Sequence, residues 1–217
     1  MKTPTRMAEA VDLIPDGASL LFGGFMGVGS PHRLFAALAQ AGKKNLTIIG
    51  NDGALPDHGV GKLITAGAVS RAIVSHIGLN PELQQKMIAG EIEVELVPQG
   101  TLAERIRAGG FGLGGVLTAT GLGTPVEDGK QTVEVDGKTF LLEKPIRADF
   151  ALVHAQYADY VGNLQYSLTA HNFNPVIAMA ADCVIVEAHE IVPVGVIPPD
   201  NVKTPGILVD HILERAA

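Results

Sequence analysis

Short apolar segments alternate with amphipathic segments from Arg6 to Gly123, and this alternation constrains the fold more than any other feature of the chain. The apolar segments predict buried strands at residues 19–24, 46–50, 71–75 and 93–97. The segments around them place apolar residues at helical spacing and predict helices at residues 6–14, 31–41, 81–89 and 101–108. Strands that alternate with helices in this way are typical of a parallel sheet covered by helices.

The pattern changes after Gly123. Residues 131–142 alternate polar and apolar side chains around Asp136-Gly137, which predicts an antiparallel hairpin. We expect a second hairpin around residues 161–163 and an irregular tail rich in proline and glycine. Further elements are expected as a strand at 149–154, a helix at 173–181 and a strand at 182–187. The prediction is therefore an α/β fold: a single open, mostly parallel sheet with helices on both faces and an inserted antiparallel hairpin, in one domain over residues 1–217.

The composition excludes several classes of function. The chain has 217 residues, of which 47% are hydrophobic and only 18% are charged. So little charge indicates that a partner covers some of the surface, although a large interior would have the same effect. The net charge of −7 argues against nucleic acid as a main partner, because phosphate binding demands a basic face.

The expected location is the cytoplasm. No apolar stretch approaches the roughly 18 residues of a membrane span, and residues 1–6 lack a signal-peptide core. The single cysteine, Cys183, cannot form an internal disulfide, which fits a reducing compartment. Because Cys183 lies in an apolar run, we expect a buried strand residue rather than a catalytic thiol.

A glycine-rich loop follows the first predicted strand. It contains Gly23, Gly24, Gly27 and Gly29, and Pro31 is expected to be the first residue of the next helix. A strand, a glycine loop and a helix N-terminus together can bring backbone N–H groups and a helix dipole to an anion or a pyrophosphate. A tight turn without any ligand would use glycine in the same way, so both interpretations stay open.

Other motifs narrow the choice of ligand. A phosphate-binding loop would need lysine after its last glycine, whereas Gly29 is followed by Ser30. A dinucleotide-binding loop would need a third glycine where His32 stands, although Asp52 has the position of a ribose-binding acid. A nucleotide-dependent oxidoreductase therefore remains an alternative, as does a protein that binds a sugar phosphate. The spacing of the histidines predicts no metal site, and no Gly-x-Ser-x-Gly motif predicts a serine hydrolase.

The glycine loop also belongs to a longer pattern. The run from Asp16-Gly17 through Gly23-Gly24-Phe25 to Gly29-Ser30-Pro31 resembles the signature of the alpha subunits of the 3-oxoacid CoA-transferase family. Similar blocks recur at residues 75–82, 97–110, 120–124 and 172–175, so the resemblance covers roughly residues 6–210. The pattern is most similar to the alpha subunits of bacterial acetate/acetoacetate CoA-transferases, and only a little less similar to those acting on succinate or 3-oxoadipate. The resemblance implies the same open α/β fold.

The resemblance implies that this chain supplies half of an active site. CoA transfer needs a carboxylate that attacks the thioester and donors for the resulting oxyanion. In this family the nucleophilic glutamate, which becomes a glutamyl-CoA thioester, belongs to a beta subunit or to the C-terminal half of fused enzymes, and no matching motif occurs here. The resemblance therefore implies activity only with a beta subunit, in an α2β2 assembly, with acyl-CoA and carboxylate substrates and no tightly bound cofactor. Four glutamates of this chain are available carboxylates, but each has a plainer structural interpretation than a nucleophile: Glu104, Glu127, Glu143 and Glu187.

Gln99 is the catalytic residue that the resemblance implies. It follows a predicted strand end, where open α/β sheets place ligand groups, and its carboxamide can donate to an oxyanion. From the residues alone, a glutamine that caps the next helix would be the simpler interpretation. His76 and Asn80 follow another strand end and could line the same cleft. The resemblance also associates one segment with CoA binding: Gly24, Phe25, Met26, Gly27, Val28, Gly29 and Ser30. The glycines of this segment could equally allow close contact with another subunit.

Overall fold

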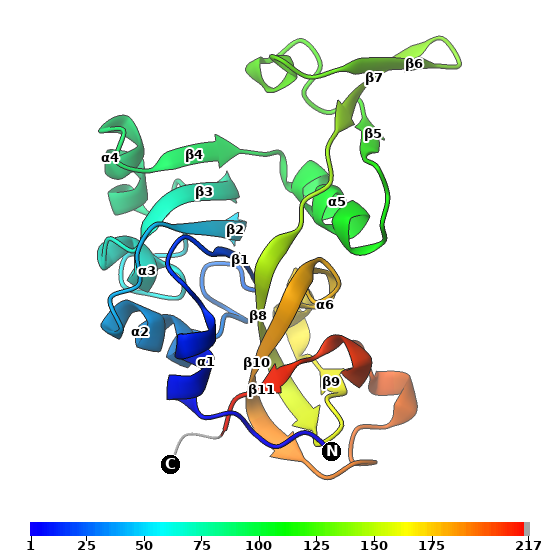
Figure 1. Cartoon of the computed structure of the whole chain (residues 1–217). Helices are drawn as coiled ribbons and strands as arrows, with labels where there is room; N and C mark the ends of the chain where they lie inside the picture. Colours follow the sequence, from blue (N-terminus) through cyan, green and yellow to red (C-terminus); the bar gives the residue numbers. More distant parts are fainter. Residues whose placement is uncertain (215–217) are drawn as a thin grey trace.

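Seven parallel strands form the central sheet of residues 1–214, the part of the chain that the computed structural model describes (Figure 1). A short strand, β9 (Leu164–Gln165), pairs antiparallel with β8 and confirms the hairpin expected around residues 161–163. The predicted domain of residues 1–217 extends beyond the described part by residues 215–217. In spatial order the parallel strands are β11 (His211–Ile212), β10 (Ala181–Val192), β8 (Ala148–Asp159), β1 (Ser19–Phe22), β2 (Leu46–Asp52), β3 (Val69–His76) and β4 (Glu93–Leu96).

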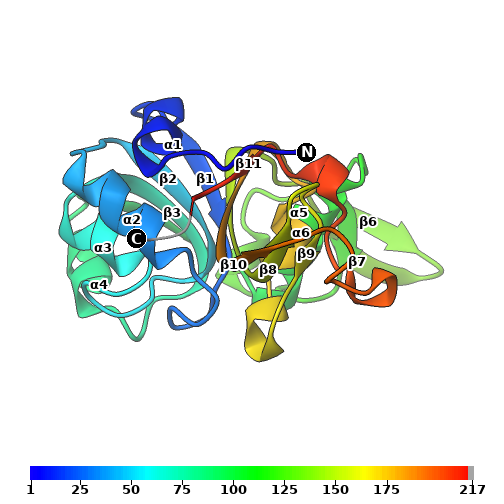
Figure 2. The same ribbon diagram turned by 90° about the horizontal axis from the view of Figure 1, so that it is seen from below.

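Helices cover both faces of this sheet, as Figure 2 shows. One face carries α1 (Met7–Leu13), α2 (His32–Gln40), α3 (Gly61–Thr65) and α4 (Pro81–Ile88). The other face carries α5 (Gln99–Gly110) and α6 (Asn174–Ile177). Successive side chains of a strand point to opposite faces, so in β1 the residues Leu20 and Phe22 pack into one hydrophobic cluster and Leu21 into the other. The expected fold class is confirmed.

A small antiparallel sheet projects from the body beyond α5 (Figure 1). It consists of β5 (Val116–Thr118), β7 (Lys138–Glu143) and β6 (Thr132–Val135), in that spatial order. Val135 pairs with Lys138 across Asp136 and Gly137, whose φ angles are 51° and 72°. Positive φ at both central residues is what a type I′ hairpin turn requires. The inserted hairpin is confirmed, and β5 adds a strand that the sequence did not predict.

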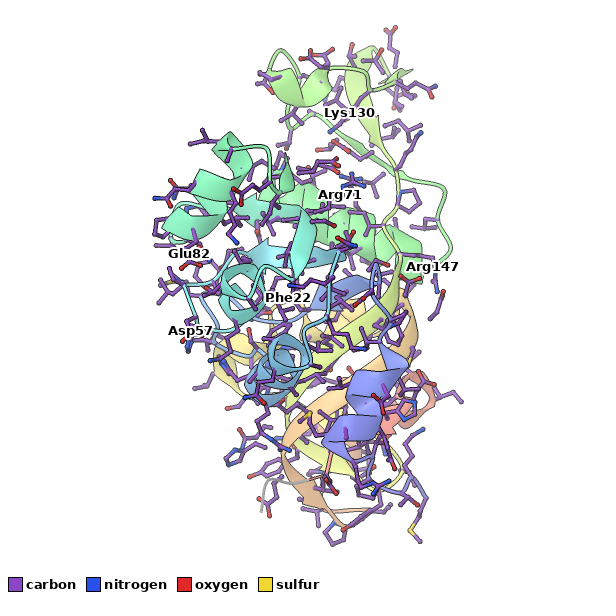
Figure 3. The ribbon with its side chains drawn as sticks, turned by 60° about the vertical axis from the view of Figure 1, so that its left-hand side comes forward. Phe22, Asp57, Arg71, Glu82, Lys130 and Arg147 are labelled. Carbon is purple, nitrogen blue, oxygen red and sulfur yellow. The ribbon has the colours of Figure 1, made fainter. Side chains whose placement is uncertain are left out.

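A chain of ion pairs ties the small sheet to the edge of the central sheet. Arg105 of α5 lies 2.8 Å from Glu95 of β4 and 3.8 Å from Glu143 of β7. Glu143 is 2% exposed and also pairs with Lys130, while Glu95 pairs with Arg71 of β3. Figure 3 labels Arg71 and Lys130, which belong to this series of ion pairs, and Arg71 also lies 3.3 Å from Glu93. The carboxylate of Glu143 is therefore paired and not free, and Glu143 has the structural role expected for it.

Some predicted boundaries were wrong. The helix predicted at 173–181 is only α6, because Ala181 already pairs with Ala148 at the start of β10. Pro31 is the N-cap of α2 rather than its first residue, and α5 begins at Gln99, two residues before the predicted start of 101–108. The helix α3 was not predicted. The tail is less irregular than expected, since it contains β11 and two short 3-10 helices, Pro199–Asn201 and Gly206–Leu208. Two further 3-10 helices lie earlier in the chain, at Pro125–Glu127 and Leu168–His171.

Candidate functional site

The carboxyl ends of four neighbouring strands meet along one edge of the sheet. The strand order β8-β1-β2 places β1 where the topology switches direction, since β2, β3 and β4 follow on one side and β8 and β10 lie on the other. Open α/β sheets bind ligands outside the carboxyl ends of the strands at such a switch point. Polar groups gather at this edge: residues 23–31 after β1, Asn51 and Asp52 in β2, Ser75 and His76 in β3, and Gln99 after β4.

The carboxamide of Gln99 is held by hydrogen bonds at this edge. Its Nε2 donates to Asn51 Oδ1, and its Oε1 accepts from the hydroxyl of Ser75. Asn51 is only 2% exposed, and its Nδ2 donates to Gly24 O at 2.7 Å. Because the amide nitrogen of Asn51 donates to Gly24 O, the amide oxygen of Asn51 is the atom that faces Gln99. This oxygen can only accept a hydrogen bond, so the Gln99 carboxamide must turn its nitrogen toward Asn51. One amide hydrogen of Gln99 is then left without an acceptor within residues 1–214.

A cleft of about 320 Å³ opens beside Gln99. Ala103, Phe173 and Val176 give the cleft apolar walls, and Asn51, Gln99, Glu104, Arg107 and Asn172 give it polar ones. Glu104 is the one carboxylate among these described lining residues, and Arg107 pairs with it at 2.6 Å. A second cleft, of about 460 Å³, lies between α5 and β5 and shares Glu104 and Arg107. The described part of the site thus offers a donor but no unpaired carboxylate.

The tip of the glycine loop is a tight turn. Phe25 and Val28 exchange two backbone hydrogen bonds, of 3.0 and 2.9 Å. The residues between them, Met26 and Gly27, have φ angles of 52° and 85°. The turn exposes the apolar side chains of Phe25, Met26 and Val28, which are respectively 51%, 38% and 55% exposed. The predicted CoA-binding segment therefore presents apolar side chains to solvent.

The N-terminus of α2 is not free to hold an anion, so this part of the prediction was wrong. Arg33 N and Leu34 N donate to the carboxylate of Glu187 at 3.2 and 2.9 Å. Glu187 lies within β10, not at a strand end as expected, and is 6% exposed. Burial raises the pKa of Glu187, while the two N–H donors and the Arg33 charge act in the opposite direction. A carboxylate of the protein itself occupies the position that an anion bound at this helix N-terminus would take.

Most backbone donors of the loop are also used internally. Gly24 N donates to Asn172 Oδ1 at 3.0 Å, and Met26 N donates to Asp52 Oδ2 at 2.9 Å. Asp52 also accepts a hydrogen bond from Ala54 N at 2.8 Å and is 2% exposed. Its carboxylate therefore anchors the loop and is not free to bind a ribose. In residues 23–30, the N–H groups without an internal acceptor in the described part are those of Gly27 and Gly29.

A pair of histidine rings packs under the loop, and the sequence did not predict it. The ring centroids of His32 and His58 are 4.7 Å apart, and His32 Nε2 lies 2.8 Å from Gly27 O. A Cβ built on Gly27 would lie 2.4 Å from His58. Burial lowers the pKa of His32, and the charge of His58 lowers it further. Burial likewise lowers the pKa of His154, with smaller effects of His32 and His189.

Other candidate residues have structural roles. Asn80 is fully buried, caps α4 through Leu83 N at 3.0 Å and donates to Gly53 O at 2.7 Å, so it does not line the cleft. His76 is exposed at the end of β3. Cys183 is half-buried on β10, and burial raises its pKa to about 11, which leaves it a weak nucleophile.

Within residues 1–214 no group of three or more His, Cys, Asp or Glu side chains is placed to hold a metal ion. In the same range every helix is too short or too polar to span a lipid bilayer.

The sequence reasoning missed Asn51, Ser75 and Asn172. Asn51 and Ser75 end or follow predicted strands, so the rule that ligand groups lie at strand ends could have identified them. Asn172 gives no such signal, because its contact with Gly24 joins segments 148 residues apart.

The chain is similar to a well-defined set of proteins. A family model described as "Coenzyme A transferase" matches residues 5–215. Acetate CoA-transferase subunit alpha of Escherichia coli (strain K12) is 54% identical over 207 residues, which are 95% of this chain and 94% of that protein. The acetoacetyl-CoA:acetate/butyrate CoA transferase alpha subunit of Clostridium acetobutylicum is 48% identical and covers 93% of both chains. A solved structure of an acyl-CoA transferase from Escherichia coli O157:H7 superposes with a TM-score of 0.87 at 28% identity, covering 99% of this chain and 47% of that one.

Proposed function

The chain belongs to the coenzyme A transferase family, as an alpha-type subunit, and from this premise we propose its substrates and mechanism. The enzyme moves CoA between a short-chain acyl-CoA, such as acetyl-CoA, and a short-chain fatty acid or 3-oxoacid such as acetoacetate. The two relatives reported above support this choice, because their names contain acetate and acetoacetyl-CoA. The runner-up is transfer from succinyl-CoA or to 3-oxoadipate, since relatives with those names are 46% and 44% identical.

One observation carries the proposed mechanism: Gln99 presents a free amide hydrogen at a cleft whose described carboxylate is already paired with Arg107. The donor half of an acyl-transfer site is therefore here, and the nucleophile comes from a partner. Gln99 Nε2 donates to the oxyanion that forms when a carboxylate attacks the thioester carbonyl. A fixed donor of this kind stabilises the transition state more than the ground state.

The nucleophile in this mechanism is a glutamate of a beta subunit. Its carboxylate attacks the acyl-CoA carbonyl and expels the CoA thiolate, which leaves an acyl-glutamyl anhydride. The thiolate then attacks the glutamyl carbonyl, releases the first acid as a carboxylate and forms the glutamyl-CoA thioester. The acceptor acid reverses these steps and leaves as its CoA ester. Every step passes through an oxyanion within reach of a donor such as Gln99.

The glycine loop, from Gly24 to Ser30, is proposed to contact CoA. Three features support this: the exposed side chains of Phe25 and Val28, the N–H groups of Gly27 and Gly29 without an internal acceptor in the described part, and the link from Gly24 O through Asn51 to Gln99. CoA is a substrate, and no cofactor stays tightly bound. We place the chain in a cytoplasmic α2β2 assembly, as one domain over residues 1–217.

The experiment is reconstitution with the beta subunit. The purified chain, the beta subunit and their mixture are each assayed for acetoacetyl-CoA formation from acetyl-CoA and acetoacetate, and again with succinyl-CoA as donor. We expect activity only in the mixture and a higher kcat/KM with acetyl-CoA. A higher kcat/KM with succinyl-CoA would favour the runner-up, and a mixture without CoA transfer would overturn the proposal.

A further inference from the structure

Ser75 lies at the carboxyl end of β3, beside the proposed oxyanion donor. Its hydroxyl reaches two acceptors, Gln99 Oε1 and Asn51 O, the second at 2.8 Å. A serine hydroxyl has a single hydrogen, so it can satisfy only one acceptor at a time. Gln99 is an exposed side chain on the first residue of α5, and outside this contact nothing described holds its oxygen. Ser75 is therefore the one described donor to that oxygen, and its donation to Gln99 Oε1 rather than to Asn51 O fixes where the oxygen points.

The orientation of the Gln99 carboxamide matters because its two ends have opposite polarity. The amide nitrogen stabilises an oxyanion, whereas the amide oxygen in the same place would repel it. Asn51 holds the nitrogen end on one side, since its own nitrogen is committed to Gly24 O. The Ser75 hydroxyl, which is not among the lining residues of the cleft, holds the oxygen end. The two contacts together leave one productive orientation.

We propose that Ser75 is a positioning residue for CoA transfer: it fixes Gln99 Oε1 so that the remaining amide hydrogen of Gln99 faces the cleft. The proposal rests on the proposed function, because it assumes that Gln99 is the oxyanion donor. It also explains why a hydroxyl stands at this strand end, next to the buried amide of Asn51. Ser75 contacts neither substrate nor CoA in this role and acts only through Gln99.

The first test compares variants of Ser75 in the assembled enzyme. Removal of one neutral hydrogen bond should lower kcat by about 3- to 10-fold in Ser75→Ala, with KM for acyl-CoA unchanged. Ser75→Thr keeps the hydroxyl and should recover most of the loss. Ser75→Cys, nearly isosteric with a weak donor, should behave like the alanine variant and serves as the alternative if that variant fails to assemble. Ser70→Ala, on an exposed residue of the same strand, is the matched control and should leave kcat unchanged.

The second test separates positioning from a general structural role. If Ser75 acts only through Gln99, Ser75→Ala should cost nothing further in a Gln99→Ala background, whereas a structural defect would lower kcat again. The inference would be overturned if Ser75→Ala kept the kcat of the wild-type enzyme, or if it lost the same factor in kcat in both backgrounds. In either case the proposed function would stand as long as the assembled wild-type enzyme transfers CoA. An assembled wild-type enzyme that does not transfer CoA would instead overturn the proposed function itself.

Discussion

Glu187 caps α2 from a distant strand: its carboxylate accepts a hydrogen bond from Leu34 N at 2.9 Å, between residues 153 apart in the sequence. Pro31, the N-cap of α2, has no side chain that could cap the helix itself. The contact fixes the start of α2 against β10 and therefore fixes the end of the glycine loop that precedes α2. The same contact excludes a bound anion from this helix N-terminus.

The first prediction tests this cap. Glu187→Ala should lower the free energy of unfolding by about 1–2 kcal/mol, because it leaves Arg33 N and Leu34 N without an acceptor. Glu187→Gln keeps one acceptor and removes a buried charge, so it should cost less than about 1 kcal/mol and keep full CoA-transfer activity. Urea unfolding measures both values. An inactive but folded Glu187→Gln enzyme would show that the carboxylate takes part in the chemistry.

The second prediction concerns Gln99. Gln99→Ala in the assembled enzyme should lower kcat by roughly 10²–10³, as removal of one oxyanion donor does in other enzymes. Its unfolding free energy should change by less than about 1 kcal/mol, since the side chain is exposed. Gln85→Ala, at an exposed position of α4, is the control. If Gln99→Ala had wild-type turnover, Gln99 would not be the oxyanion donor and would be only a polar residue at the start of α5.

The third prediction uses two glycines with similar backbone conformations. Gly27 and Gly17 have φ angles of 85° and 80°, but a Cβ on Gly17 meets nothing within 4 Å, whereas a Cβ on Gly27 meets His58 at 2.4 Å. Both alanine variants should lose about 1–3 kcal/mol of stability from backbone strain. Only Gly27→Ala should also raise KM for acyl-CoA, if the loop contacts CoA.

Size-exclusion chromatography separates the two possible roles of the loop. If the loop mainly contacts the beta subunit, Gly27→Ala should impair assembly and leave KM of the remaining complex unchanged. Wild-type kinetics together with wild-type assembly would show that the loop has neither role.

The fourth prediction concerns pH. The pKa values of His32 and His154 are lowered in the folded chain, chiefly by burial, whereas unfolded histidine titrates near 6.5. The unfolded state therefore binds more protons on acidification, so the stability that these groups contribute is present above about pH 6.5 and is lost as the pH falls below it. His32→Gln and His154→Gln should each make this loss shallower, by at most about one proton. Urea unfolding between pH 7.5 and 5.5 measures the slope, and an unchanged slope in both variants would contradict the assignment.

The sequence predicted the sheet well because its signals are local. Apolar runs such as 46–50 and the Asp136-Gly137 turn specify their structure through neighbouring residues. The strand-end rule likewise placed Gln99 after the carboxyl end of β4, where the structure has it. The length of α6 was mispredicted because Ala181 belongs to β10, where it pairs with Ala148 of β8. Tertiary pairing overrides local helix propensity in such cases.

The site was predicted less completely, because it depends on contacts between distant segments. Glu187 with Leu34, and Asn172 with Gly24, join residues that no periodicity relates. Asp52 shows the same difficulty: its position after β2 fits a ribose-binding acid, but Met26 N and Ala54 N occupy its carboxylate. Motif spacing predicts where a side chain lies along the fold, but it does not predict which groups of the protein form hydrogen bonds with it.

The location of the CoA thioester tests the central claim most directly, that this chain supplies the oxyanion donor while a partner supplies the nucleophile. The assembled complex is incubated with acetoacetyl-CoA without an acceptor acid, freed from unbound ligand and analysed by intact-mass spectrometry of both subunits. We predict that the mass of CoA, less one water, is added to the beta subunit and that this chain keeps its unmodified mass. The same adduct on a glutamate of this chain would contradict the account.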